Sequence, residues 1–236
     1  MKLKNLICGV IVLIIISGLT SCMNNDDPAP YGGSVVYISS KYVEDEIQYS
    51  LVINSQGVHA IFSRIDILMP NGNSLTLEPD DPSYSYSSYQ SPYSTVKPPA
   101  GAYTSTFYFP DGQTFQSVTS LLGTVIFPPE VTSCEYQSVN NSISIDWEGG
   151  QNITAYDVSM YEPGGKHVFT SIVNNYLTIT SEKTYYVINQ SVGAWSESPH
   201  NGQYYIIVTA YNLSQTNVIR AISVSEKINV TWGTVQ

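Results

Sequence analysis

The sequence predicts an all-β protein made of two tandem β-sandwiches, which follow a secretion signal and a short tether. No segment after residue 30 keeps a helical period, and short runs of strand-forming residues alternate with turn signals instead. Nineteen tyrosines and a charged fraction of only 12% are typical of extracytoplasmic β proteins. A Pro128-Pro129 pair then predicts a boundary between two domains, because neither proline can donate to a strand ladder.

The first element is a signal peptide over residues 1–21. Lys2 and Lys4 precede a continuous apolar run from Leu6 to Ile16, which is shorter than the ~18–20 residues that a membrane-spanning helix needs. The run ends at Leu19-Thr20-Ser21-Cys22, which resembles the lipobox of bacterial lipoproteins. That resemblance implies that Cys22 becomes the new N-terminus and carries fatty acyl chains such as palmitate. Two or more chains would hold the protein stably in the membrane.

Residues 22–33 form the predicted acylated cysteine and flexible tether, which is rich in proline and glycine. Asp26-Asp27 lies a few residues after Cys22, and such paired acids resemble the surface-export signal of Bacteroidetes lipoproteins. We therefore expect an outer-membrane lipoprotein exposed at the cell surface. The alternative is an outer-membrane lipoprotein that faces the periplasm.

Residues 34–127 are predicted to form the first sandwich. Apolar residues mostly alternate with polar ones between Ile61 and Met69, as in a half-buried strand. Asn71-Gly72 and Asp111-Gly112 predict two tight hairpins, because both pairs readily adopt the positive φ that such turns require. The predicted strands are 34–39, 48–54, 61–69, 73–77, 101–109 and 117–127.

Residues 128–236 are predicted to form the second sandwich, with strands at 142–147, 155–161 and 201–212. Pro-Pro-x-Val, Ser-Ile-x-Ile-x-Trp, Tyr-x-Val-x-x-Tyr and Tyr-x-Ile-x-Val-x-Ala-x-Asn resemble strands A, B, C and F of a fibronectin type III domain. This resemblance implies that Trp147 and Tyr204 pack between two sheets. The stretch 184–202 is longer than usual in that family. The first block lacks such markers, and its entry Gly101-Ala102-Tyr103 suggests an immunoglobulin-like sandwich.

Charge and cysteine content restrict the possible functions. The net charge of −10, without basic clusters, argues against nucleic-acid binding and against electrostatic attraction to anionic lipid. Cys8 leaves with the signal and Cys22 is used by the lipid, so Cys134 has no partner for an intrachain disulfide. The sequence therefore predicts that Cys134 is a buried, inert thiol and that the cores alone hold the fold.

The candidate binding residues are aromatic. A segment rich in serine and proline carries Tyr84, Tyr86, Tyr89 and Tyr93, and tyrosine offers the stiff amphipathic area that suits sugar faces or protein partners. The alternative is a long loop whose tyrosines pack back on the sandwich. Trp195 is a second candidate, either as an exposed sugar platform or as a cap on the core.

Catalytic and metal sites lack support in the sequence. His59, His167 and His200 stand apart, with no zinc-type spacing, and no G-x-S-x-G motif occurs. Asp80-Asp81 with Glu78 could hold calcium, but a solvated loop explains these acids more simply. We therefore expect no metal site, no cofactor and no enzyme. The predicted function is a membrane-anchored binding module for a glycan or partner protein, with a structural spacer or assembly subunit as the alternative and a glycoside hydrolase as a remote one.

Overall fold

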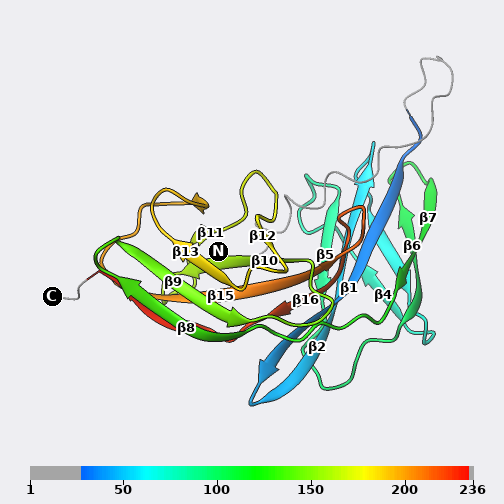
Figure 1. Cartoon of the computed structure of the whole chain (residues 1–236). Coiled ribbons are helices and arrows are strands. Elements are labelled where there is room, and N and C mark those ends of the chain that lie inside the picture. Colours follow the sequence, from blue (N-terminus) through cyan, green and yellow to red (C-terminus); the bar gives the residue numbers. More distant parts are fainter. Residues whose placement is uncertain (1–27, 234–236) are drawn as a thin grey trace.

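The computed structural model describes residues 28–233, and within that range every regular element is a β-strand (Figure 1). This confirms the predicted all-β class. The first module contains β1 (Tyr31–Val43), β2 (Glu46–Val58), β3 (Arg64–Leu68), β4 (Ser74–Leu77), β5 (Tyr86–Gln90), β6 (Gly101–Tyr108) and β7 (Thr114–Leu121). The second module contains β8 (Glu130–Gln137), β9 (Ser142–Glu148), β10 (Ala155–Tyr161), β11 (His167–Thr170), β12 (Ile179–Thr180), β13 (Tyr185–Ile188), β14 (Ala194–Trp195), β15 (Gly202–Leu213), β16 (Ile219–Val224) and β17 (Ile228–Trp232).

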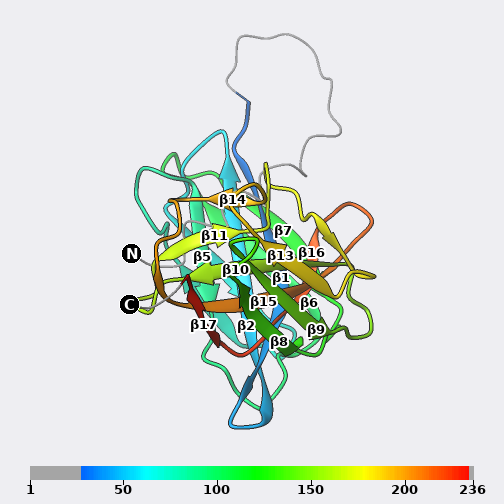
Figure 2. The ribbon, with the colours of Figure 1, turned by 60° about the vertical axis from the view of Figure 1, so that its left-hand side comes forward.

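One ten-stranded sheet runs through both modules. Its order is β14-β11-β10-β15-β16-β1-β2-β5, with β12 paired to β10 and β17 paired to β15. A four-stranded sheet, β4-β3-β6-β7, covers one end of it, and a three-stranded sheet, β13-β9-β8, covers the other (Figures 1 and 2). The molecule is therefore two β-sandwiches that share one of their layers.

The first module encloses its own core between β1–β2 and the four-stranded sheet. Along β3 the buried Ile65 and Ile67 alternate with more exposed residues, as the sequence pattern predicts, but the strand is shorter than the predicted 61–69 and Ile61 lies before it, 40% exposed. Both predicted hairpins are present, and Gly72 and Gly112 take φ values of 84° and 85° in their turns. The core side chains are Val36, Ile38, Leu51, Ile53, Phe62, Ile65, Ile67, Leu77, Tyr103, Phe107, Phe109 and Leu121.

The second module encloses a larger core, in which the predicted aromatic residues meet. Trp147 on β9 and Tyr204 on β15 are 3% and 2% exposed, and the rings of Trp147 and Tyr156 lie 5.2 Å apart in an edge-to-face arrangement. The Tyr204 hydroxyl donates to the His200 carbonyl four residues upstream, at 3.0 Å. A tyrosine that bonds back to its own chain at the start of this strand is typical of immunoglobulin-like sandwiches.

The first strand begins earlier than the sequence predicts. The sequence pattern places Tyr31–Gly33 in the tether, but these residues pair with Gln56–Val58 as the start of β1. Gly32 is needed for packing rather than for flexibility, because a Cβ there would lie 2.6 Å from the ring of Phe107. Close approach to a core ring therefore explains Gly32, which the sequence pattern places in a flexible linker.

The two modules are joined by backbone pairing as well as by the Pro128-Pro129 segment. Ile38–Lys41 of β1 run parallel to Ala221–Val224 of β16, an arrangement that the sequence did not predict. Tyr37 and Val52 from the first module and Ile219 and Ile222 from the second form a third buried cluster beside this ladder. Separate tandem domains therefore stay a prediction, while the shared sheet is an observation.

Candidate functional site

The tyrosine-rich segment forms the edge of the ten-stranded sheet. β5 pairs antiparallel with β2 and is the last strand at that end. Tyr84 precedes it in a turn, where its backbone N–H donates to the carbonyl of Asp81 at 3.0 Å. Its side chain is 67% exposed, whereas those of Tyr86, Tyr89 and Tyr93 are half-buried. Tyr84 is thus the ring of this segment that a ligand could reach without rearrangement.

Tyr86 belongs to a hydrogen-bond chain on the outer face of the sheet. Its hydroxyl donates to Oδ1 of Asn54 at 3.0 Å, and Ser88 Oγ donates to the same oxygen at 2.8 Å. The Asn54 amide in turn donates to the hydroxyl of Tyr37 at 3.3 Å. Tyr37 is almost fully buried, and this burial raises its pKa well above the ordinary value. Tyr86 therefore helps to satisfy buried polar groups in the shared sheet.

Tyr89 and Tyr93 lie on opposite faces of the sheet. Tyr89 packs against the core of the first module. The Tyr93 hydroxyl lies 2.9 Å from Ser39 Oγ on β1, and the ammonium group of Lys41 lies 4.2 Å from the centroid of its ring. Alternation along the edge strand sends Tyr86 and Tyr89 to opposite sides of the sheet, and Tyr93, three residues after β5 ends, lies on the same side as Tyr86.

Trp195 on β14 is half-buried against the core of the second module. Its ring centroid lies 4.7 Å from that of Phe169 and 5.8 Å from that of Trp232. Its indole N–H donates to the carbonyl of Asn189 at 3.0 Å. The structure thus places Trp195 as a cap that also holds the loop before β14 in position.

Cys22, the predicted lipidation site, lies outside the described residues. Cys134 is partly buried on β8, and burial raises the pKa of its thiol to about 12. Its thiolate is therefore scarce at neutral pH.

In residues 28–233 no three His, Cys, Asp or Glu side chains gather in a way that could hold a metal ion. His59 adopts a left-handed backbone conformation with φ of 66°, and His200 contacts the ring of Tyr204. Burial lowers the pKa of His167, against a smaller opposing effect from Asp157. Within the same range no helix is long and apolar enough to cross a membrane.

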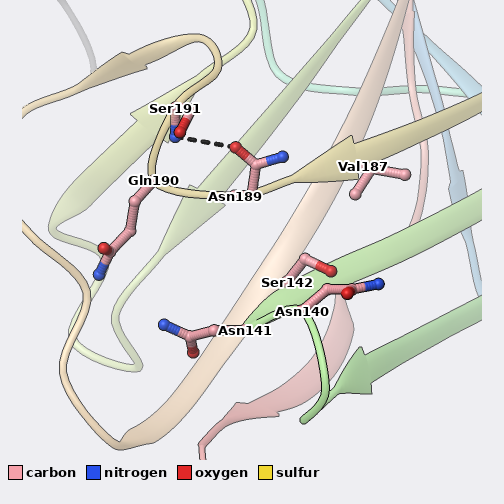
Figure 3. A pocket seen from close by; sticks show the side chains of 7 residues that line it. All are labelled: Asn140, Asn141, Ser142, Val187, Asn189, Gln190 and Ser191. Atoms are coloured by element: carbon pink, nitrogen blue, oxygen red, sulfur yellow. Dashed lines mark hydrogen bonds between the residues drawn. The ribbon is translucent and has the colours of Figure 1, made fainter.

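A surface pocket of about 470 Å³ lies in the second module (Figure 3), and the turns that line it are at the end remote from the first module (Figure 1). Two turns form it, one between β8 and β9 and one after β13, and they face each other across the opening. Neither turn stood out in the sequence, where only their runs of amide residues mark them. The lining residues are Asn140, Asn141, Ser142, Val187, Asn189, Gln190 and Ser191.

The pocket walls are held by hydrogen bonds to the fold. Oδ1 of Asn189 accepts the backbone N–H of Ser191 at 2.8 Å, which closes the turn after β13. Oδ1 of Asn141 accepts the hydroxyl of Tyr136 at 2.7 Å, and Asn141 takes a left-handed conformation with φ of 47°. The side chains of Asn140 and Gln190 are exposed at the opening. The pocket therefore combines anchored amides with accessible ones.

Comparisons with known proteins leave the family open. No family model matches the chain, and no curated protein matches it. Among solved structures, it resembles the BSP domain of a biofilm associated protein with 15% identity over 87% of this chain and 30% of that one, at a TM-score of 0.28. It also resembles a tetra-tandem repeat in the extending region of a large adhesion protein, with 15% identity over 86% of this chain and 50% of that one, at a TM-score of 0.25.

A third similar structure is dimeric latent PorU from Porphyromonas gingivalis, with 12% identity over 86% of this chain and 20% of that one, at a TM-score of 0.32. This chain thus spans half or less of the length of each of these three structures. At such identities and TM-scores the similarities carry no information on ligand or activity, and the chain is not assigned to a family.

Proposed function

We propose that this protein is a non-enzymatic lipoprotein of the outer membrane that binds a glycan or a partner protein at the cell surface. The lipobox-like Leu19–Cys22 supports the anchor, and Asp26-Asp27 supports surface exposure. The observation that carries the binding role is the placement of the pocket. β1 begins in the first module, whereas the two turns that line the pocket, between β8 and β9 and after β13, lie at the opposite end of the molecule (Figure 1). An anchored protein of this form would hold the pocket away from the membrane.

A structural spacer or assembly subunit is the second candidate, and the shared sheet favours it. The ladder between Ile38–Lys41 and Ala221–Val224 joins the modules directly, so the molecule does not depend on a flexible linker for its length. A spacer needs this stiffness but does not need an accessible pocket.

The two roles are separated by binding experiments on the full-length protein in detergent. For the binding role, we expect a specific signal on a glycan array, or a single enriched partner in a pull-down from solubilised membranes. A stable complex with outer-membrane proteins that survives removal of every surface glycan would favour the assembly role. Neither a glycan nor a partner in both assays would contradict the proposal.

The anchor is tested by Cys22→Ser. The substitution removes the thiol that the lipid needs, so we expect the protein to leave the membrane fraction or to accumulate as uncleaved precursor. Fractionation and mass spectrometry measure both outcomes, and a processed Cys22→Ser protein that stays in the membrane would refute lipidation. Digestion by protease added to intact cells would separate surface exposure from the periplasm-facing alternative.

A further inference from the structure

We infer that the pocket at the end of the second module is a binding site for a neutral saccharide. This inference rests on the proposed binding function and assigns to it a site that differs from the tyrosine-rich segment and Trp195. Three properties of the pocket carry it: its set of hydrogen-bonding groups, its lack of charge and the surface that borders it.

The hydrogen-bonding groups match a ligand that donates and accepts at every position. Four of the seven lining side chains are primary amides and two are hydroxyls. A primary amide offers one acceptor oxygen and two N–H donors, and a hydroxyl both donates and accepts. The hydroxyl groups of a sugar have the same double capacity. In Asn141 and Asn189 the amide oxygen already accepts a hydrogen bond, from the Tyr136 hydroxyl and the Ser191 N–H respectively. The exposed amides of Asn140 and Gln190 take no part in these bonds.

The pocket lining contains no ionisable side chain. A charged ligand would therefore give up part of its hydration without gaining a counter-charge, which is costly. A neutral polyhydroxylated ligand avoids this cost. The volume of about 470 Å³ lies within the range of ~300–1,000 Å³ in which small ligands are bound.

Apolar surface borders the amides on one side, as a sugar ring with its C–H faces requires. Val187 lines the pocket and is 39% exposed. Tyr185 lies two residues earlier on β13, on the same face of the strand, and is 56% exposed. Its ring stays 56% exposed although the ammonium group of Lys183 lies 5.1 Å from its centroid, and this exposed aromatic area could meet a second sugar unit. The site thus suits an oligosaccharide that extends from the pocket along β13.

The experiment uses an array of immobilised neutral hexose and pentose oligosaccharides beside uronate-containing and sulfated ones, probed with the full-length protein. We expect the bound members to be neutral. The double variant Asn140→Ala/Gln190→Ala should weaken the strongest neutral signal at least tenfold, with an unchanged Tm because both side chains are exposed. Asn140→Asp/Gln190→Glu keeps the shape but removes N–H donors and adds charge, so it should weaken binding by as much.

Gln215→Ala is the matched control, because it removes an exposed amide that does not line the pocket. Gln215 lies in the turn between β15 and β16. The control variant should leave binding unchanged. Binding confined to anionic glycans, or a neutral signal that survives both pocket variants, would overturn the inference. A signal lost in Tyr84→Ser but kept in the pocket variants would also overturn it while leaving the proposed function intact. A peptide or protein partner without any glycan signal would have the same effect, whereas no ligand of either kind would contradict the proposed function itself.

Discussion

Asp157 is a carboxylate buried on β10, and each of its oxygens has hydrogen-bond donors. Oδ1 accepts the hydroxyls of Thr170 and Ser171 at 2.8 and 2.9 Å and the backbone N–H of Ser171 at 3.2 Å. Oδ2 accepts the hydroxyl of Ser159 at 2.6 Å. The side chain thus ties β10 to the end of β11, in addition to the backbone ladder between these two strands. A structural role accounts for all of its contacts.

Asp157→Ala should destabilise the protein by ~3 kcal/mol, because it leaves the three buried hydroxyls of Ser159, Thr170 and Ser171 without their acceptor, while the Ser171 N–H keeps the carbonyl of Val158 at 2.9 Å. The midpoint of urea unfolding measures the loss. Asp66→Ala is the control, since Asp66 lies on the surface beside Arg64 at 3.5 Å and such exposed pairs contribute ~1 kcal/mol or less. Equal losses in the two variants would contradict the role assigned to Asp157.

At the scale of the element, β5 shows why four similar residues should behave differently. Tyr84 precedes the strand and is exposed, whereas Tyr86 and Tyr89 point to opposite faces of an edge strand. The place of each ring, in the turn before β5 or on one face of the strand, distinguishes a tyrosine that can meet a ligand from one that fills the fold. Mutation of all four tyrosines together would therefore mix loss of binding with loss of stability.

Tyr84→Ser should change the free energy of unfolding by less than ~0.5 kcal/mol, as exposed positions usually do. Tyr89→Ser should cost ~2 kcal/mol or more, because it removes a ring that packs against the first core. Thermal unfolding of the two single variants measures the difference. If both variants melt like the wild type, the segment is more loosely packed than its contacts imply.

At the scale of the whole molecule, the shared sheet couples the two modules. Unfolding of either one would break the ladder between β1 and β16 and would expose Tyr37 and Ile222, which are 1% and 9% exposed in the native protein. Two independent sandwiches would instead unfold in two steps. We expect the coupling to dominate, since the joined strands lie at the centre of the ten-stranded sheet.

Differential scanning calorimetry of Trp147→Ala tests this coupling. Removal of the large core ring should cost ~3–5 kcal/mol, and we expect a single transition that shifts to lower temperature as a whole. Two transitions, of which only the one from the second module moves, would support the tandem-domain prediction instead.

Buried tyrosines make the folded state sensitive to alkali. Burial raises the pKa of Tyr103 and Tyr161 from 10 to about 12. Between pH 10 and 12 the unfolded chain loses the phenolic protons while the folded chain keeps them. The contribution of the two neutral tyrosines to the free energy of unfolding is therefore complete below pH 10 and is lost as the pH rises toward 12.

The melting temperature should therefore fall between pH 10 and 12. Tyr103→Phe should reduce this fall, because the variant has one fewer group that ionises on unfolding. If Tyr103→Phe shows the same pH dependence as the wild type, ionisation of Tyr103 does not contribute to the alkaline loss.

Much of the fold could be predicted from local pattern. Alternating apolar residues, the Asn71-Gly72 and Asp111-Gly112 turns and the tryptophan that ends 142–147 act within a few residues of chain, so the sequence itself determined the all-β class, the hairpins and the burial of Trp147. The lipobox-like motif is equally local, and it stays a prediction from sequence.

Pairing between residues far apart in the chain decided how the strands and the candidate sites are arranged. The parallel ladder between β1 and β16 joins residues that lie more than 180 positions apart, and hydrogen bonds between backbones leave little mark on residue type. The same holds for the candidate sites. Tyr84 and Tyr86 look alike until the fold places Tyr84 in a turn and Tyr86 on β5, and the turns at Asn140 and Asn189 form a pocket only when β9 and β13 pair. The sequence by itself determined which strands form, and the tertiary structure decided which of them meet.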